Sequence, residues 1–175
     1  MRLFFAINFC SQTRNSLLAL RDELKSLAEY GSFTLPENLH VTLAFLGECS
    51  TKQVSVAKAS VDSVRFEPFD ILVERIGRFG GVQGEALWWA GVRVNEPLAA
   101  LHRDLTKNLF ASGFVLDRRR FSPHITLGRR VVTDATPWRI EPFGEIVRKI
   151  DLMKSERIDG KLTYTAIHEK TSDMR

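Results

Sequence analysis

Two stretches of the chain carry nearly the same tetrad. Residues 38–48 read NLHVTLAFLGE, and residues 121–129 read FSPHITLGR. In each stretch a histidine, His40 or His124, is followed by an apolar residue, a threonine and a leucine. From ordinary residue usage, a given histidine has such neighbours only about a few times in a thousand. Two copies among four histidines are therefore not expected by chance, and they make the tetrads the first candidates for both fold and function.

The apolar and polar residues of each tetrad alternate, which predicts a β-strand. Successive side chains of a strand point to opposite faces. In the first copy, His40 and Thr42 therefore share one face, whereas Leu43 and Phe45 point to the other. The second copy repeats this arrangement. The apolar face of each strand can anchor it in a core, and the polar face needs hydrogen-bonding partners or a cleft.

If the two strands face each other, His40 and His124 converge with the hydroxyl groups of Thr42 and Thr126. Imidazole titrates near neutral pH, so one ring can accept a proton while the other donates one. Threonine hydroxyls can donate hydrogen bonds to phosphoryl oxygens. This set has no strong nucleophile, so water or a substrate hydroxyl would attack. The pair predicts phosphodiester chemistry, although either histidine taken alone is more often a structural residue.

Length and composition indicate a globular protein. The chain has 175 residues, of which 44% are hydrophobic and 26% charged, which favours one compact domain, of one or two lobes, over residues 1–175. The net charge of +4 is compatible with an RNA partner but does not require one. The two cysteines form no Cys-x-x-Cys pair, which fits a reducing cytoplasm. No apolar run reaches the roughly 20 residues that span a bilayer, so we expect no membrane partner.

Hydrophobic periodicity and turn residues predict interleaved strands and helices. Hairpins are also expected, because residues 80–86 hold a glycine-rich loop between two strands. This combination favours an α+β fold with mixed or antiparallel sheets. The predicted strands cover residues 2–9, 36–47, 69–79, 86–94, part of 121–130, 145–153 and 162–168, and the predicted helices cover residues 11–30, 51–64 and 97–111.

Together with RLFFAI at residues 2–7 and LWWAGV at residues 87–92, the tetrads resemble the two-histidine (2H) phosphoesterase superfamily, which carries two His-x-(Thr/Ser)-x motifs. Within it the sequence is most similar to the RNA 2′,3′-cyclic phosphodiesterase family, also called 2′-5′ RNA ligase. The resemblance implies a bilobal fold in which two mostly antiparallel sheets, with helices outside, flank a central cleft under pseudo-twofold symmetry.

The same resemblance implies an activity and partners. The substrate would be RNA with a 2′,3′-cyclic phosphate end, or a cyclic nucleotide. The enzyme would hydrolyse it to a 2′-phosphate by breaking the bond to O3′, and it could also join RNA ends through a 2′-5′ link. The resemblance implies no metal and no cofactor, and we expect a monomer.

Residue roles follow from the resemblance. His40 would be the acid that protonates O3′, and His124 the base that activates water. Pseudosymmetry makes the two nearly interchangeable, so the division stays open. Thr42 and Thr126 would bind the phosphate oxygens, and Arg129 matches an arginine of the family that could do the same.

Arg129 raises a geometric difficulty. Strict alternation puts Arg130, and not Arg129, on the face of His124. A bulge or strand end at Gly128 would remove the difficulty, so Arg130 remains an alternative. Phe121 matches an aromatic residue of the family and could stack on the terminal base.

Other basic and aromatic residues are weaker candidates. Arg120 belongs to the basic run RRR, which is either an RNA contact near the cleft or a solvated loop. His102 and His168 are expected to be structural or surface residues. Trp88 and Trp89 point to opposite faces of one strand, so one belongs to the core and the other can line the cleft.

Other functions remain open from the sequence. A zinc site needs three or four protein ligands with clustered spacing, and the sequence contains no such cluster. A non-catalytic RNA-binding module would use the cleft and the arginine run, but it would not need two imidazoles. A 2H enzyme could instead act on a different cyclic phosphate or on 2′-5′ oligoadenylate.

Overall fold

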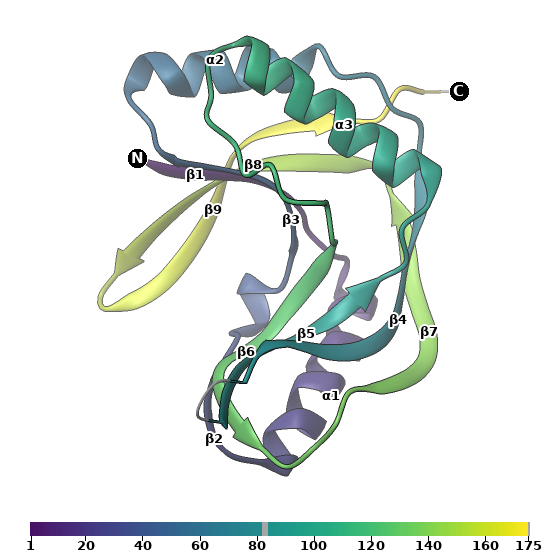
Figure 1. Cartoon of the computed structure of the whole chain (residues 1–175). Helices are drawn as coiled ribbons and strands as arrows, with labels where there is room; N and C mark the ends of the chain where they lie inside the picture. Colours follow the sequence, from purple (N-terminus) through teal and green to yellow (C-terminus); the bar gives the residue numbers. More distant parts are fainter. Residues whose placement is uncertain (82–83, 175) are drawn as a thin grey trace.

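The computed structural model describes residues 1–81 and 84–174 (Figure 1). The glycine-rich loop predicted at residues 80–86 therefore lies partly outside the described residues. The helices are α1 (Ser11–Leu27), α2 (Thr51–Asp62) and α3 (Glu96–Ala111), with a short 3-10 helix η1 (Pro36–Asn38). The strands are β1 (Arg2–Ile7), β2 (Ala28–Phe33), β3 (Val41–Glu48), β4 (Phe69–Gly80), β5 (Glu85–Val92), β6 (His124–Thr133), β7 (Trp138–Val147), β8 (Lys149–Ile158) and β9 (Lys161–Thr171).

The strands form two sheets. One has four strands in the order β3-β1-β8-β9, and the other has five in the order β2-β6-β5-β4-β7. Every strand pair in both sheets is antiparallel. The predicted α+β fold with two antiparallel sheets is thus confirmed. The two tetrad strands, β3 and β6, belong to different sheets and contact each other where the sheets meet.

The helices cover the outer sides of this arrangement (Figure 1). Helices α2 and α3 pack on each other beside the four-stranded sheet, and α1 packs on the five-stranded sheet. Local signals start two of them: Ser50 and Gln53 form a reciprocal capping box before α2, and the Asn95 side chain caps α3. Among the described residues, no helix is both long and apolar enough to cross a bilayer.

The helix predicted for residues 11–30 is too long. Helix α1 ends at Leu27, and the following residues form β2, which pairs with β6. The Thr133 hydroxyl donates to the Leu27 carbonyl at 2.7 Å, which fixes this transition. Strand pairing here overrides local helix propensity. As a result, the tetrad strand β6 is paired on both sides.

The single strand predicted for residues 145–153 is also wrong. The chain instead leaves the five-stranded sheet at the end of β7 and enters the four-stranded sheet at the start of β8, with only Arg148 between them. The alternation of side chains in the sequence continues from β7 into β8 without turn residues between them. The sequence therefore does not reveal that the chain changes sheets here. The predicted strand at residues 36–47 is shorter than expected, because its first residues form η1.

Candidate active site

The two tetrad histidines are held in the same way. His40 precedes β3 and His124 begins β6. The Nδ1 atom of each lies 2.7 Å from the carbonyl oxygen of the residue two positions earlier, Asn38 or Ser122. Because a carbonyl can only accept, Nδ1 carries the proton of the neutral ring. In both histidines the Nε2 atom is therefore the one that can exchange a proton with a substrate.

The environments of the two Nε2 atoms differ. Nε2 of His40 lies 3.0 Å from Oγ1 of Thr42, so the hydroxyl donates to the neutral ring. Nε2 of His124 makes no hydrogen bond within the described part of the chain. Thr126 lies two residues further along β6, and its carbonyl accepts a 2.8 Å hydrogen bond from the Thr34 hydroxyl. Strand β2 and the residue that follows it, Thr34, thus hold the second tetrad in place.

Each imidazole is flanked by two aromatic rings from other strands. The rings next to His40 are those of Phe4 and Tyr164, with centroids 4.9 and 5.3 Å away. The rings next to His124 are those of Phe79 and Trp89, at 5.1 and 6.3 Å. Of these four, only Trp89 is predicted from the sequence as a residue that can line the cleft. The others look like core residues in the sequence, because an aromatic residue in a strand gives no sign of which distant histidine it meets.

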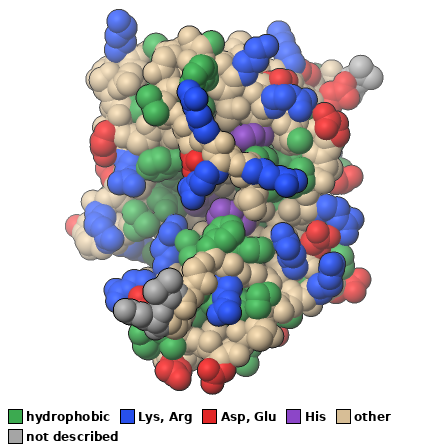
Figure 2. All heavy atoms as spheres, in the orientation of Figure 1, with side chains coloured by type: hydrophobic (Ala, Val, Ile, Leu, Met, Phe, Trp, Pro, Cys, Tyr) green, Lys and Arg blue, Asp and Glu red, His purple; other side chains and the backbone are tan. Residues whose placement is uncertain are grey.

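Charged residues of the five-stranded sheet act on His40, which precedes β3 of the four-stranded sheet. Burial lowers the pKa of His40, and the positive charges of His124 and Arg129 lower it further, while the Asn38 carbonyl opposes them. Residues of the second tetrad region are therefore close enough to act on the first. Figure 2 shows histidine side chains in a hollow of this face, with Lys and Arg side chains around it. The structure thus brings together the two histidines that the sequence singled out.

A bulge in β3 changes the expected face of Phe45. In the pairing of β1 with β3, Phe5 opposes Ala44 and Ala6 opposes Thr42, so Leu43 has no opposite residue. Such a bulge reverses the alternation beyond it. Phe45 is 46% exposed and opposes Phe4, a ring neighbour of His40. The prediction that Phe45 points away from Thr42 is therefore wrong.

A second irregularity resolves the position of the two arginines. Along β6, Thr126 opposes Trp89 and Gly128 opposes Trp88, so Leu127 has no opposite residue. This bulge reverses the alternation and puts Arg129 on the face of Thr126. Between Gly128 and Val131, which opposes Ala86, β6 again has one residue more than β5. Arg130 lies in the extra stretch with φ of 52° and pairs with Glu85 at 3.3 Å. The charge of Arg129, in contrast, lowers the pKa values of both His40 and Tyr164. Arg129 is the arginine on the cleft side.

The remaining candidates lie on the connection before β6. The Phe121 ring stacks on that of His102 in α3, with centroids 3.8 Å apart and planes 5° from parallel. The arginines of the basic run differ in their contacts. Arg119 pairs with Asp117 at 2.6 Å. Arg120 is exposed and makes no ion pair among the residues described. The fourth histidine, His168, pairs with Asp62 at 2.7 Å away from the tetrads.

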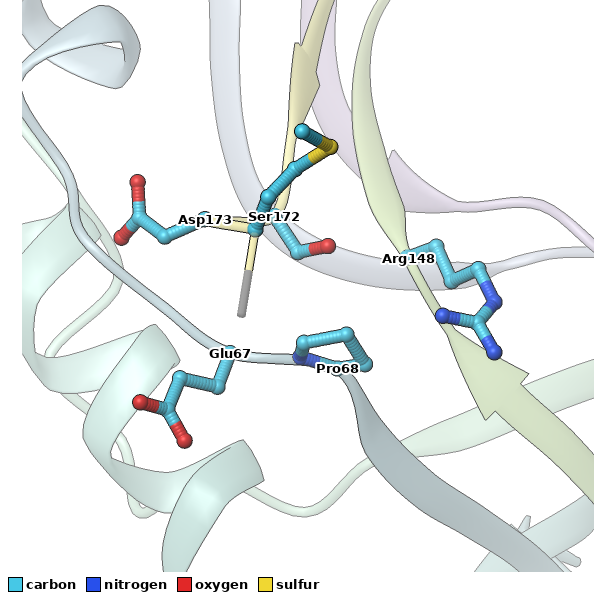
Figure 3. Close-up of a pocket in the computed structure, with 6 residues that line it drawn as sticks. Glu67, Pro68, Arg148, Ser172 and Asp173 are labelled. Atoms are coloured by element: carbon cyan, nitrogen blue, oxygen red, sulfur yellow. The ribbon is translucent and has the colours of Figure 1, made fainter.

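Two further features bear on the location of the site. A surface cavity of about 310 Å³ is lined by residues 67–68, Arg148 and residues 172–174 (Figure 3). It contains none of the predicted site residues, so we base the candidate site on the convergent side chains and not on cavity volume. Over residues 1–81 and 84–174, no group of three or more His, Cys, Asp or Glu side chains is arranged to hold a metal ion.

Comparisons with known proteins agree with this fold. The family model "LigT like Phosphoesterase" matches residues 7–89. An RNA 2′,3′-cyclic phosphodiesterase of Archaeoglobus fulgidus is 31% identical over 162 residues, covering 89% of this chain and 91% of its own. The Escherichia coli protein of the same name is 30% identical over 170 residues, covering 95% and 93%. The crystal structure of E. coli LigT with 3′-AMP superposes with a TM-score of 0.83 at 26% identity, covering 99% of this chain and 98% of the other.

Proposed function

The chain belongs to the LigT-like phosphoesterase family, and from this premise we propose that it hydrolyses 2′,3′-cyclic phosphates at RNA ends, or on nucleotides, to 2′-phosphates. One observation in particular supports the proposal. Two imidazoles from different sheets share a site, and a backbone carbonyl fixes Nδ1 of each, which leaves both Nε2 atoms for proton transfer. A site with one base and one acid suits the addition of water across a phosphodiester bond.

The proposed reaction breaks one bond. Nε2 of His124 takes a proton from water, and the water oxygen attacks phosphorus. The bond from phosphorus to O3′ breaks on the opposite side, and protonated Nε2 of His40 gives its proton to O3′. The phosphate stays on O2′. If a 5′-hydroxyl of a second RNA takes the place of water, the same steps give a 2′-5′ link.

Three side chains are proposed to hold the phosphate. The Thr42 hydroxyl donates to Nε2 of His40 while that ring is neutral; once the ring is protonated, the hydroxyl is free to donate to a non-bridging oxygen. The Thr126 hydroxyl donates to the other such oxygen, and Arg129 supplies a positive charge on the cleft side. Phe121 is assigned to the terminal base, with His102 behind it. A backbone contact is assigned to Arg120, because its charge is not neutralised within the described residues. Arg130 is already engaged by Glu85, which argues against a role at the phosphate.

The lowered pKa of His40 fits an acid that becomes protonated when the anionic substrate binds. Burial favours the neutral ring in the free protein. A phosphate anion beside Nε2 favours the charged ring and so opposes the effect of burial. We therefore propose that His40 takes up its proton together with the anionic substrate.

The function can be tested by the identity of the product. We expect an oligoribonucleotide with a 2′,3′-cyclic phosphate end to be converted to the 2′-phosphate in the presence of excess chelator. Phosphorus NMR or chromatography against both isomers measures the outcome. Formation of the 3′-phosphate would contradict cleavage at O3′, and no conversion at all would contradict the proposed function. Parallel assays with other cyclic phosphates and with 2′-5′ oligoadenylate define the substrate class.

Arg129→Gln is expected to change the pH profile of kcat/KM. Activity falls as pH rises through the pKa of the catalytic acid. The charge of Arg129 lowers the pKa of His40, so its removal raises that pKa. The fall in kcat/KM at alkaline pH, which we call the alkaline limb of the profile, should then occur at higher pH. We also expect kcat/KM below the limb to fall about 10- to 100-fold, the usual effect of losing a charged hydrogen bond.

Arg130→Gln is the matched control for this experiment. It removes the same charge one residue further on, where the partner is Glu85 at the surface. Exposed ion pairs contribute about 0–1 kcal/mol, so we expect an unmoved limb and a change in kcat/KM of about twofold or less. A shifted limb in Arg130→Gln with none in Arg129→Gln would reverse the assignment of the two arginines.

A further inference from the structure

The surface beside His40 continues beyond the catalytic tetrad along the four-stranded sheet. In the pairing of β1 with β3, Phe4 opposes Phe45 and Ala6 opposes Thr42. Directly opposed residues of an antiparallel pair share a face. Thr42 and Phe45 are therefore on the same face as Phe4, whose ring contacts that of His40. The bulge at Leu43 thus turns an exposed aromatic ring toward the side of the sheet that carries the site.

Arg2 and Phe45 form a preassembled pair on this face, which we call the Arg2–Phe45 platform. The Arg2 guanidinium lies 5.0 Å from the centroid of the Phe45 ring, and the Phe45 side chain is 46% exposed. Arg2 makes no ion pair in the part of the chain that the structure describes. Its cross-strand neighbour Glu48 is instead engaged by the amino group of Met1 at 3.1 Å.

The charge of the platform reaches a residue of the candidate active site. The charges of Arg129 and Arg2 both act on Tyr164, where they oppose the effect of burial, which raises the pKa of that phenol. The Tyr164 ring packs edge-on against that of His40. The charges of Arg2 and Arg129 therefore both reach one aromatic residue at the site. A cation next to an exposed aromatic ring is the combination that binds single-stranded nucleic acid, through phosphate pairing and base stacking.

The direction of the proposed reaction determines which part of an RNA would reach this platform. In an in-line displacement, the attacking and leaving oxygens are on opposite sides of phosphorus. Water comes from the side of His124, so O3′ and its ribose lie on the side of His40. The 5′-linked nucleotides of the RNA leave that ribose on the same side. Because of the bulge, Thr42 and Phe45 oppose residues only two apart on β1, so they are about 7 Å apart along the strand, which the adjoining nucleotides can span.

We propose that the Arg2–Phe45 platform binds the RNA nucleotide on the 5′ side of the cyclic-phosphate end, with its base on Phe45 and its phosphate on Arg2. The inference rests on the proposed function and deepens it. It makes a single-stranded RNA end, and not a cyclic mononucleotide, the preferred substrate. The two substrates share the same reacting group and differ only in whether they reach the platform.

The test compares kcat/KM for two substrates: a tetraribonucleotide with a 2′,3′-cyclic phosphate end, and a nucleoside 2′,3′-cyclic phosphate. We expect Phe45→Ser to lower the value for the tetranucleotide about tenfold, the usual effect of losing one base stack. The mononucleotide value should change by less than about twofold. Phe45→Trp should retain the preference. Arg2→Gln should lower the slope of log(kcat/KM) against log salt concentration by about one for the tetranucleotide.

Phe110→Ser provides the matched control. Phe110 on α3 is 58% exposed and also pairs with an arginine, Arg118, at 5.3 Å, but among the described residues its ring contacts neither tetrad. We expect its substrate preference to equal that of the unmodified protein. An unchanged tetranucleotide value in Phe45→Ser, an equal loss on both substrates, or an equal loss in Phe110→Ser would overturn the proposal.

A direct binding measurement separates this inference from the proposed function. Fluorescence anisotropy can follow a labelled tetraribonucleotide that ends in a 2′-phosphate, the expected product, without turnover. We expect Phe45→Ser to weaken its binding about tenfold and to leave binding of a nucleoside 2′-phosphate unchanged. If the protein hydrolyses neither cyclic substrate but shows this difference in binding, the proposed function fails and the platform stands. Equal affinities in the variant and the unmodified protein would overturn the platform alone.

Discussion

Replacement of His40 or His124 by alanine is expected to lower kcat/KM for cyclic-ended RNA about 10²- to 10⁴-fold, the usual contribution of a general acid or base. Each Nε2 atom is proposed to carry one of the two proton transfers, and the other two histidines have different partners. His102 stacks on Phe121 and His168 pairs with Asp62. The rates can be measured with a labelled oligonucleotide under conditions of substrate excess.

His168→Ala is the control, because it removes an imidazole of the same size from a surface ion pair. We expect it to retain activity within about twofold, since isolated surface pairs contribute little. The double variant of His40 and His124 should lose less than the product of the two single losses, because residues that act as a unit are not additive. Full activity in both single variants would refute the proposed site.

The same variants can decide which histidine is the acid. A general base must be neutral and a general acid must be charged, so the pH profile of kcat/KM is bell-shaped. If His124 is the base, His124→Ala removes the acidic limb and leaves the alkaline one. If His40 is the acid, His40→Ala does the opposite. The reverse pattern would exchange the two roles without moving the site.

Trp88→Ala is expected to have the largest effect on stability. The Trp88 side chain is fully buried, lies 6.0 Å from the Trp138 ring and is covered by the Arg78 guanidinium at 5.9 Å. Truncation of a buried tryptophan costs about 3–5 kcal/mol, because it removes apolar burial and leaves a cavity. For a chain of this length, that corresponds to a fall in Tm of about 6–20 °C. Thermal and denaturant unfolding measure both quantities.

The contrast is with an aromatic residue at the surface. Phe110→Ala removes a ring that is more than half exposed, and we expect the free energy of unfolding to change by about 0.5 kcal/mol or less. If Trp88→Ala unfolds at the same temperature as Phe110→Ala, the assignment of Trp88 to the core is wrong. The adjacent Trp89 contacts the ring of His124 instead, so the two neighbouring tryptophans serve different parts of the molecule.

The sequence predicted the anchors of the site well. In each tetrad the apolar residues alternate with the histidine and threonine, and Val41, Ile125 and Leu127 are indeed fully buried. This alternation is a property of the extended backbone itself, so it can be read without knowing which strands pair. The same is true of α2 and α3, whose starts are fixed by side chains within a turn of the helix. The antiparallel α+β architecture followed from the order of these elements.

Tertiary structure decided what lies around the tetrads. The bulge that turns Phe45 toward the site, and the one that separates Arg129 from Arg130, exist only because β1 and β5 pair with the tetrad strands in a particular register. A one-residue shift of register reverses the face of every later side chain. The rings that flank the histidines come from strands far away in the sequence, and strand β2 forms against its local helical pattern. Local periodicity thus determined that the histidine and threonine of each tetrad share a face, and long-range strand pairing decided which other residues join that face and what they meet there.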